Sequence, residues 1–577
     1  MKFLSLLFCA FTVSITAAEP EFPLTADSKP QADVAKGTLI KDSYTASESS
    51  VFPGTVREYQ IYLPAGFDKA QPAHFMVFQD GVIYQAPVVF DNLIAKKDIP
   101  SLVGIFIKPG VVPAANDNAL PRFNRSYEYD SITPTYSKFL IEEFLPAIEK
   151  KHAISLSQDP NHAAISGNSS GGICAFMVAW HRPDRFRRVF TGVGTYVGIH
   201  GADQLPVLVR KIEPKPLRIY LQSGTGDNNL YCGDWWMANQ MMERSLAWAG
   251  YDVNHAWGEG GHNQKHASQI FPDVLRWLWR DWQTDIEVKA NPKGESKWKG
   301  YEVVEDEKWV AAKESCSYAS VITSDSNGDV VWLEENSTHH ALFLTRHSSG
   351  DNPRRFGESF SPFALHDIAF GKDNCLYVLC SMKATKDTVF KIDRAGQRHD
   401  VKFISKDTLA VAFNSVLSIA RAGGLVGNWP ATEHLPGLSE YGGKITISPD
   451  QTTIYQAQQG AEIIAWQYGT NGSLNQRQPY CMLQLDSEAV VNPQSLCVDT
   501  EGRLYVATSL GIQVCDQAGR VNFIIPTPKP AHDVCFGGKD LSELFIACGD
   551  SIYKRPTKVH GVVSGQQAPI KPAPPKL

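Results

Sequence analysis

The chain has 577 residues, of which 43% are hydrophobic and 20% charged, a composition typical of globular proteins that excludes wholesale disorder. A chain of this length is expected to form about two to four domains. Lysine and arginine total 55 against 61 acidic residues, which gives a formal net charge of −6. This small acidic excess argues against a protein that binds nucleic acid through a basic face.

The N-terminus has the pattern of a secretory signal peptide. Lys2 precedes the apolar run Phe3–Ile15, and small residues ending at Ala18 offer a cleavage site. The run is shorter than the roughly 20 apolar residues that span a bilayer, and no later stretch is long and apolar enough. We therefore expect residues 1–18 to be removed and the mature protein to be secreted or periplasmic, without membrane contact.

Of the 11 cysteines, Cys9 lies in this signal, and the others are scattered without the paired spacing of zinc ligands. Buried free thiols are therefore the expected state. An oxidising compartment would also allow one or two disulfides, whose pairing the sequence leaves open.

Residues 40–284 alternate short apolar runs with amphipathic helical patterns, which predicts a mostly parallel sheet covered by helices on both faces. The expected strands are Arg57–Leu63, Phe75–Gln79, Leu102–Lys108, Ala163–Ser166, Arg188–Gly192, Leu217–Gln222 and Asp252–Trp257. The expected helices are Tyr136–His152, Ile173–Trp180, Trp235–Ala249 and Ile270–Trp282. We expect Pro146 to kink or end the first of these helices.

The polar segment Lys289–Lys299 contains proline and glycine and indicates a linker at residues 285–304. Beyond it, a motif recurs in which apolar residues and a turn with Gly or Asp lead into a β-rich run. Its six markers are spaced by 45, 48, 30, 50 and 40 residues: Trp332, Tyr377, Leu425, Tyr455, Tyr505 and Phe545. These intervals predict an all-β, six-bladed β-propeller at residues 305–557, with a β-sandwich as the alternative. The Pro-rich tail at 558–577 is expected to be disordered from Gln567.

The sharpest motif is Gly-Asn-Ser-Ser-Gly-Gly at residues 167–172. It follows the apolar residues Ala163–Ile165 and opens a helix, the context in which G-x-S-x-G forms a nucleophile elbow. The glycines allow a tight turn that lifts one hydroxyl above the sheet. The register of the motif assigns that hydroxyl to Ser169.

A serine nucleophile needs a base, and in this fold class the histidine comes last in the chain. His262 follows the final expected strand and lies in a glycine-rich turn. We assign His262 as the base and expect His255 and His266 to be structural.

The base needs an orienting carboxylate between the serine and the histidine in the chain. Asp227 lies just past the end of the strand Leu217–Gln222, where this carboxylate is needed, and is assigned as the acid. Asp234 and Glu259 remain competitors, and a turn aspartate that caps the next helix is the structural alternative for Asp227.

The oxyanion hole is expected to combine the N–H of Ser170 with one from the loop after Gln79, where Gly81 and Val82 are the candidates. Asp80 is expected to brace this loop. No GxGxxG, P-loop or HExxH motif accompanies these residues, so we expect no cofactor and no zinc hydrolysis of that kind.

Several separate motifs resemble the esterase D/enterochelin esterase branch of the α/β-hydrolases over residues 40–284. They are Phe52–Thr55, Val77–Gly81, Asn124–Asp130, Gly167–Gly172 and Trp257–His262. The resemblance implies an α/β-hydrolase fold and a serine esterase, with Ser169 as nucleophile, His262 as base and Asp227 as acid. Related members cleave acyl or feruloyl groups from sugars, or siderophore ester backbones.

Four further residues are candidates for substrate binding in such a site. Arg125, Glu128 and Tyr129 could line the entrance, and Trp235 opens the helix after the acid loop. For the first three, the alternative is a buried charge pair that holds the loop.

Residues 305–557 resemble the gluconolactonase/regucalcin propeller family through Ile445–Asp450, Leu496–Tyr505 and Cys535–Gly538. In that family a Glu, an Asn and an Asp hold a divalent metal on the axis, a ligand set that suits calcium or magnesium. Here residues 442–444 and 493–495 depart from the usual Asn and Asp motifs. We expect a propeller without the catalytic metal that serves as an accessory or binding module, with Asp450 and Asp499 as turn residues.

The leading hypothesis is an exported serine ester hydrolase that acts on a small-molecule or carbohydrate ester of acetyl or feruloyl type. The alternatives are a metal-dependent sugar lactonase in the propeller, a siderophore esterase, and a binding protein with a hydrolase fold. The oligomeric state is not predicted.

Overall fold

A computed structural model describes residues 21–574 except 49, 287–295, 317, 337–340, 349–351, 361–363, 372, 384–385, 401–443, 459, 469–473, 486–492 and 565. The expected signal peptide at 1–18 and part of the expected linker lie outside the described residues. Within the described residues, no helix combines the length and apolar character that a membrane crossing needs. The chain divides into two compact units: unit 1, Met1–Asp203, Pro216–Arg244 and Asp252–Glu287, and unit 2, Gln204–Lys215, Ser245–Tyr251 and Val288–Leu577.

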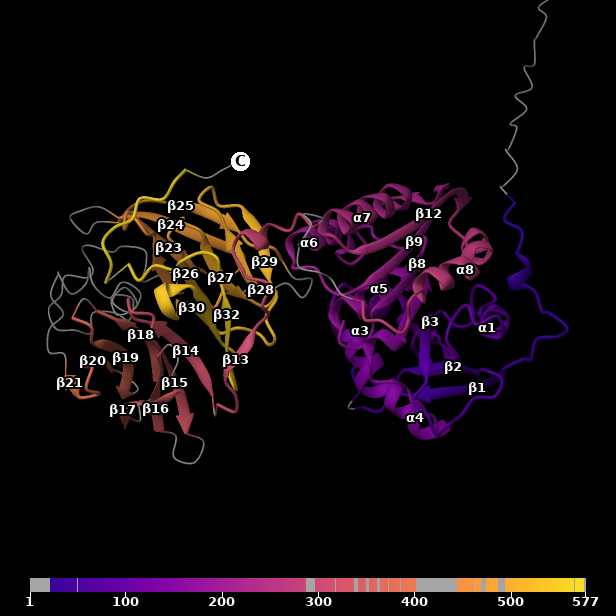
Figure 1. The fold of residues 1–577 in the computed structure, drawn as a ribbon, viewed down its shortest axis with the longest axis horizontal. Coiled ribbons are helices and arrows are strands. Elements are labelled where there is room, and N and C mark those ends of the chain that lie inside the picture. The colour runs from indigo at the N-terminus through magenta and orange to yellow at the C-terminus, as the bar shows by residue number, and fades with distance from the viewer. Residues whose placement is uncertain are drawn as a thin grey trace, which may run out of the picture. The chain divides into compact units, whose positions relative to one another are not determined.

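Unit 1 is built on a ten-stranded sheet in the order β12-β9-β8-β7-β3-β4-β2-β5-β6, with β1 paired to β2 (Figure 1). The strands from β12 to β4 run parallel, whereas β1, β2, β5 and β6 pair antiparallel. Their bounds are β1 Thr38–Thr45, β2 Val56–Leu63, β3 His74–Gln79, β4 Leu102–Ile107, β5 Val111–Val112, β6 Arg122–Phe123, β7 Ala163–Asn168, β8 Arg188–Gly192, β9 Arg218–Gly226 and β12 Asp252–Gly261. The parallel-rich sheet and its seven expected strands are confirmed.

Helices cover both faces of this sheet (Figure 1). Helices α1 and α8 share one core with the sheet, and α5 lies with α2 and α3 on the other side. The helix bounds are α1 Ala86–Ala95, α2 Arg125–Asp130, α3 Thr135–Lys138, α4 Leu145–His152, α5 Ser170–His181, α6 Leu205–Lys211, α7 Trp235–Ala249 and α8 Lys265–Leu278.

The helix expected at Tyr136–His152 is continuous in the chain but not uniform. It consists of α3, a π-helical segment at Phe139–Phe144, and α4, whose first turn holds Pro146. The π-helical segment lies just before Pro146, which has no N–H to continue the regular ladder of helical hydrogen bonds.

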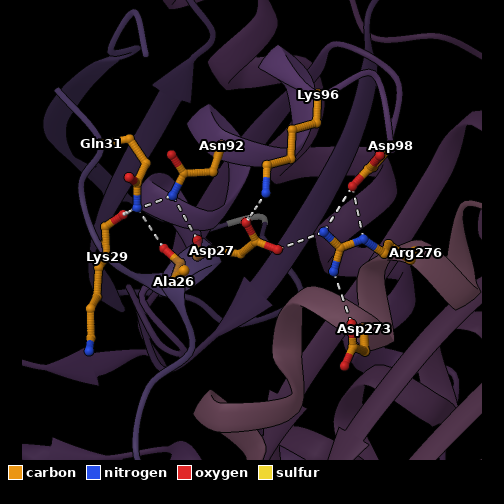
Figure 2. A network of polar contacts seen from close by, with 9 residues as sticks. All are labelled: Ala26, Asp27, Lys29, Gln31, Asn92, Lys96, Asp98, Asp273 and Arg276. Atoms are coloured by element: carbon orange, nitrogen blue, oxygen red, sulfur yellow. Dashed lines mark hydrogen bonds and ion pairs between the residues drawn. The ribbon is translucent and has the colours of Figure 1, made fainter. Parts of the chain in front are cut away.

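An N-terminal strap, residues 21–31, packs on α1 and α8 and extends the unit beyond its expected start at residue 40. The Asn92 side chain donates to the carbonyls of Asp27 and Lys29, at 2.8 and 2.9 Å (Figure 2). The Asp27 carboxylate accepts from Lys96 and from Arg276 (Figure 2). These polar contacts, together with the stacking of Phe22 on His266, hold the segment in place.

We expect the strap to loosen at acid pH. Burial raises the pKa of Asp27, but hydrogen bonds from Lys96 and Arg276 outweigh it and bring the pKa below the ordinary value of 3.8. Because the folded pKa is lowered, the stabilisation is present above about pH 4 and is lost as the pH falls through the folded value.

Hydrogen-exchange protection factors of residues 21–31 measure this loss. In the wild type they should drop below about pH 4, whereas in Asp27→Asn they should already be low at pH 7 and should change little on acidification. Equal protection in the two proteins at pH 7 would show that the carboxylate does not hold the strap.

Unit 2 contains five four-stranded antiparallel sheets among the described residues, and a β-propeller is confirmed (Figure 1). Four sheets follow the chain: β14–β17, β18–β21, β22–β25 and β26–β29; the fifth has the order β13-β32-β31-β30, so the first strand closes the last blade. Their bounds are β13 Val310–Lys313, β14 Ala319–Ser324, β15 Val330–Asn336, β16 Ala341–His347, β17 Arg354–Phe360, β18 Ala364–Phe370, β19 Leu376–Lys383, β20 Lys386–Ile392, β21 Arg398–Asp400, β22 Ile445–Ile447, β23 Thr453–Ala457, β24 Glu462–Tyr468, β25 Leu474–Met482, β26 Ser495–Val498, β27 Leu504–Thr508, β28 Gly511–Cys515, β29 Val521–Ile525, β30 Asp533–Gly537, β31 Glu543–Ala547 and β32 Ile552–Pro556.

The structure describes five blades, whereas the markers predicted six. The inner strands β18, β14, β30, β26 and β22 contact one another in that order. The marker Leu425 lies outside the described residues, in the segment 401–443 that joins the β18–β21 and β22–β25 sheets in the chain.

The recurring turn motif has a side-chain cause. The Asp499 carboxylate accepts from the backbone N–H groups of Glu501 and Arg503, and Asp450 accepts from that of Thr452. Such Asx-type bonds satisfy backbone N–H groups that have no strand partner at a turn. Both aspartates are therefore turn residues, as expected.

The C-terminal tail does not have the disorder that its proline content predicted. Ile570 N donates to Pro449 O at 2.8 Å, and the Gln566 side chain accepts from Ser326 N and donates to Gly371 O. The described part of the tail thus bonds to three blades. Composition alone missed this, because the bonds depend on blade turns that lie far away in sequence.

Candidate active site

Ser169 lies at the sharp turn between β7 and α5, with a φ of 59° and a ψ of −124°. This strained conformation is held because Ser169 N donates to Gly192 O at 2.8 Å. Two glycines make room for the turn. A Cβ on Gly167 would lie 2.1 Å from Gly171 O, and one on Gly171 would lie 3.0 Å from an Asp80 oxygen.

A continuous line of hydrogen bonds joins the three residues predicted to be catalytic. His262 Nε2 lies 2.7 Å from Ser169 Oγ, and His262 Nδ1 lies 2.6 Å from Asp227 Oδ1. The side chain of Asp227 is fully buried and also accepts from Ser223 Oγ and Asn228 N. With these partners the carboxylate is fixed toward the imidazole, which leaves Nε2 facing the serine hydroxyl.

The competing residues make other contacts. Asp234 accepts from Met237 N at 3.0 Å at the start of α7, and Glu259 is exposed. His255 pairs with Glu243, while His266 contacts the Gln222 side chain at 3.2 Å and stacks on Phe22. In this geometry only Asp227 and His262, of the residues considered, connect to the serine.

Trp235 lies beside this line rather than in an open substrate pocket, because it is only 4% exposed. Its ring packs edge-to-face on His262, and its Nε1–H donates to Thr195 Oγ1 at 3.2 Å. The sequence analysis did not identify Thr195, whose Oγ1 lies 3.3 Å from Ser169 Oγ. The sequence could have indicated Thr195 through its position just past β8, the strand next to β7 in the parallel sheet.

The three proposed oxyanion donors differ in whether their N–H groups are already bonded. Among the described residues, no hydrogen bond uses the N–H of Ser170 or of Val82. The N–H of Gly81, in contrast, donates to Ile107 O at 3.1 Å. Gly81 is therefore corrected to a structural residue, since a donor already bound to the neighbouring strand is not free to bind an oxyanion.

The loop beside these donors is braced as predicted for Asp80. The Arg125 guanidinium donates to both Asp80 oxygens, at 2.7 and 2.8 Å. Hydrogen bonds and charge from Asp80 raise the pKa of Arg125, and burial opposes this. Arg125 stays 38% exposed and is the only one of the four proposed substrate-binding residues with substantial exposure.

Glu128 and Tyr129 do not line the entrance. Glu128 forms a fully buried ion pair with Arg57, and Tyr129 is fully buried. Both residues lie on α2 with their side chains in the core. There Glu128 meets its partner, Arg57, on β2. The alternative of a buried charge pair that holds the loop is thus the one the structure has.

The axial pocket of unit 2 is lined by all five described inner strands and by Val562–Ser564. Its carboxylate, Asp533, already accepts from Ile322 N, Val534 N and Ser495 Oγ, and Lys444 also lines the pocket. Among the described residues, no three potential metal ligands cluster anywhere. This donor set does not fit the divalent metal of the propeller family.

Comparisons with known sequences agree with this division of the chain. Residues 50–276 match the family described as "Putative esterase", and residues 443–549 match the "SMP-30/Gluconolactonase/LRE-like region". Both family resemblances are confirmed. Each match covers one region of the chain and none joins the two.

Two curated relatives correspond to the two regions. An iron(III) enterobactin esterase from Dickeya dadantii is 29% identical over 152 residues, which is 24% of this chain and 33% of the relative. A regucalcin from Oryctolagus cuniculus is 30% identical over 95 residues, which is 15% of this chain and 31% of the relative. The chain thus spans about a third of the length of each.

Among solved structures, a ferulic acid esterase is similar to 43% of this chain and 99% of its own. The two share 18% sequence identity, with a TM-score of 0.34.

Proposed function

We propose that the protein is a serine ester hydrolase whose site lies in unit 1. The observation that carries the proposal is the line from Asp227 through His262 to Ser169 on a strand–turn–helix elbow. The esterase-family match over residues 50–276 supports it. This arrangement suits nucleophilic attack on a carbonyl, because a buried carboxylate, an imidazole and an exposed-turn hydroxyl are already aligned.

In the proposed mechanism, His262 Nε2 takes the proton of Ser169 Oγ as the oxygen attacks the ester carbonyl. Asp227 stabilises the imidazolium through Nδ1–H. The N–H groups of Ser170 and Val82 bind the developing oxyanion, each contributing about 3–4 kcal/mol to transition-state stability. The proton then passes from His262 to the leaving alcohol, and water activated by the same imidazole hydrolyses the acyl-enzyme.

The substrate that we propose is a carbohydrate ester of acetyl or feruloyl type, which the resemblance to the esterase branch implies. A siderophore ester is the second candidate, and the relative named as an iron(III) enterobactin esterase favours it. The partly exposed Arg125 side chain, which is bonded to Asp80, would suit either an acidic or a hydroxyl-rich group.

We propose that unit 2 is an accessory or binding module rather than a metal-dependent lactonase. The hydrogen-bonded state of Asp533 supports a propeller without the catalytic metal. Export after removal of residues 1–18 also belongs to this proposal.

The test is hydrolysis of p-nitrophenyl acetate by the mature protein with and without EDTA, followed by acetylated xylan, feruloylated arabinose and iron-loaded enterobactin. We expect the protein to hydrolyse p-nitrophenyl acetate at the same rate with and without EDTA, since no step of the proposed mechanism uses a metal. Activity lost to EDTA and restored by calcium would instead point to lactonase chemistry in the propeller. The ratio of kcat/KM among the natural esters would decide the substrate class.

A further inference from the structure

A second hydroxyl, that of Thr195, lies beside the nucleophile. Thr195 Oγ1 is 3.3 Å from Ser169 Oγ, and Thr195 N donates to Ser169 O at 3.2 Å. Thr195 is fully buried, so water does not compete for its hydroxyl. Two contacts to one residue therefore hold the Thr195 side chain in place against Ser169.

The direction of the hydroxyl bond follows from what lies behind Thr195. The indole Nε1–H of Trp235 is only a donor, and it lies 3.2 Å from Thr195 Oγ1. The threonine oxygen therefore accepts from Trp235, which leaves its proton to be donated toward Ser169 Oγ. Ser169 can accept this bond because its own proton is directed at His262 Nε2, 2.7 Å away.

The negative charge on Ser169 Oγ changes during the reaction, and the strength of a hydrogen bond donated to this atom changes with it. Oγ gains negative charge when His262 removes its proton, loses it in the acyl-enzyme, and gains it again when the ester bond to the serine breaks. A donor aimed at Oγ thus binds the two transition states more strongly than the states between them, and such differential binding raises kcat.

We propose that Trp235 and Thr195 form a donor relay that stabilises charge on Ser169 Oγ, with Thr195 as a catalytic residue and Trp235 as the residue that positions it. The inference rests on the proposed ester hydrolase function. Trp235 also packs edge-to-face on His262, so one side chain borders both partners of the serine.

Thr195→Val removes the hydroxyl and keeps the shape of the side chain. We expect it to lower kcat for p-nitrophenyl acetate about 10- to 100-fold with KM within about twofold, because the lost bond strengthens only in the transition states. Thr195→Ser should recover most of the rate. A merely structural role of the β-branched side chain predicts the opposite order, with valine active and serine impaired.

Trp235→Phe removes the N–H but keeps an aromatic ring against His262. It should lower kcat about 3- to 10-fold, and the double variant with Thr195→Val should be no slower than Thr195→Val alone, since Trp235 acts through Thr195. Additive losses, or a Thr195→Val enzyme within twofold of the wild type in kcat, would overturn the relay. The comparison uses variants whose melting temperature equals that of the wild type. A wild type that hydrolyses no ester would refute the proposed function rather than the relay.

A separate observation in unit 2 concerns two cysteines in neighbouring blades. Cys481 of β25 and Cys515 of β28 are buried, and their Sγ atoms lie 2.8 Å apart. The adjoining residues are also joined, because Tyr480 Oη donates to Asp516 O at 2.6 Å. The two thiols are thus held together by the fold and not by chance rotamers.

We infer that Cys481 and Cys515 form a disulfide when the protein folds in contact with a disulfide donor. With oxidised glutathione as that donor, the two thiols lose two protons and two electrons, the Sγ–Sγ bond forms, and the donor is reduced to two glutathione thiols. Refolding of the full chain with oxidised glutathione, followed by digestion without reductant, should yield one linked peptide pair containing both residues. It should be absent from Cys515→Ala, and recovery of both cysteines as free, alkylated thiols from the refolded wild type would refute the inference.

Discussion

Replacing Ser169 by alanine should lower kcat/KM for p-nitrophenyl acetate by about three to six orders of magnitude. The reason is that the whole covalent route depends on this oxygen, which His262 Nε2 approaches to 2.7 Å. The remaining rate would come from the Ser170 and Val82 N–H groups and from substrate binding. Initial rates over a range of substrate concentrations measure the loss.

Ser166→Ala is the matched control for this prediction. Ser166 lies three residues before Ser169 on β7 and is fully buried. Its loss removes a hydroxyl from the same strand without touching the serine–histidine line. We expect Ser166→Ala to keep activity within a few-fold of the wild type, and a loss equal to that of Ser169→Ala would show that the elbow had been disturbed rather than its nucleophile removed.

Glu128→Ala should destabilise unit 1 by about 3–5 kcal/mol. Glu128 binds Arg57 through both oxygens and accepts from Gly110 N, and neither charged side chain is exposed. Burial lowers the pKa of Arg57, but the hydrogen bonds that Arg57 donates to Glu128 and the charge of that carboxylate outweigh it and raise the pKa. Without the carboxylate, a guanidinium remains buried beside the Phe139 ring with no counter-charge. Chemical denaturation monitored by unit 1 tryptophans measures the change.

Two further variants separate the charge from the packing. Arg57→Met with Glu128→Leu should be more stable than either single truncation, because no charge is left unpaired. Glu58→Ala breaks the exposed pair with Lys108 and should change stability by less than about 1 kcal/mol. If Glu128→Ala cost no more than Glu58→Ala, the pair would not hold α2 against β2.

The sequence predicted the parallel core of unit 1 because each of its strands is a short apolar run. The strand β1, Thr38–Thr45, was missed because its residues are polar or exposed and it pairs only with β2. The strap at 21–31 was missed for a similar reason. Its placement depends on Asn92 and Arg276, which no local pattern connects to residue 27.

In the candidate site, too, some residues could be predicted from local sequence patterns and others could not. Ser169, Asp227 and His262 each follow a strand, so their positions could be predicted from strand order and glycine context. The roles of their neighbours could not, since only the distances show that Thr195 contacts Ser169 and that Trp235 contacts Thr195 rather than lining an open pocket. For Glu128 the sequence leaves both the entrance and a buried charge pair open, because its partner, Arg57, is 71 residues away in the chain.

Labelling with a fluorophosphonate probe tests the central claim most directly, because the probe reacts with a serine only when a neighbouring base activates it. The mature full-length protein is incubated with the probe, and the adduct is located by peptide mass spectrometry. The account predicts one adduct per chain, on Ser169, that is absent from Ser169→Ala and retained in Ser166→Ala. An unlabelled Ser169 in a preparation that hydrolyses p-nitrophenyl acetate, or an adduct on another residue, would contradict it.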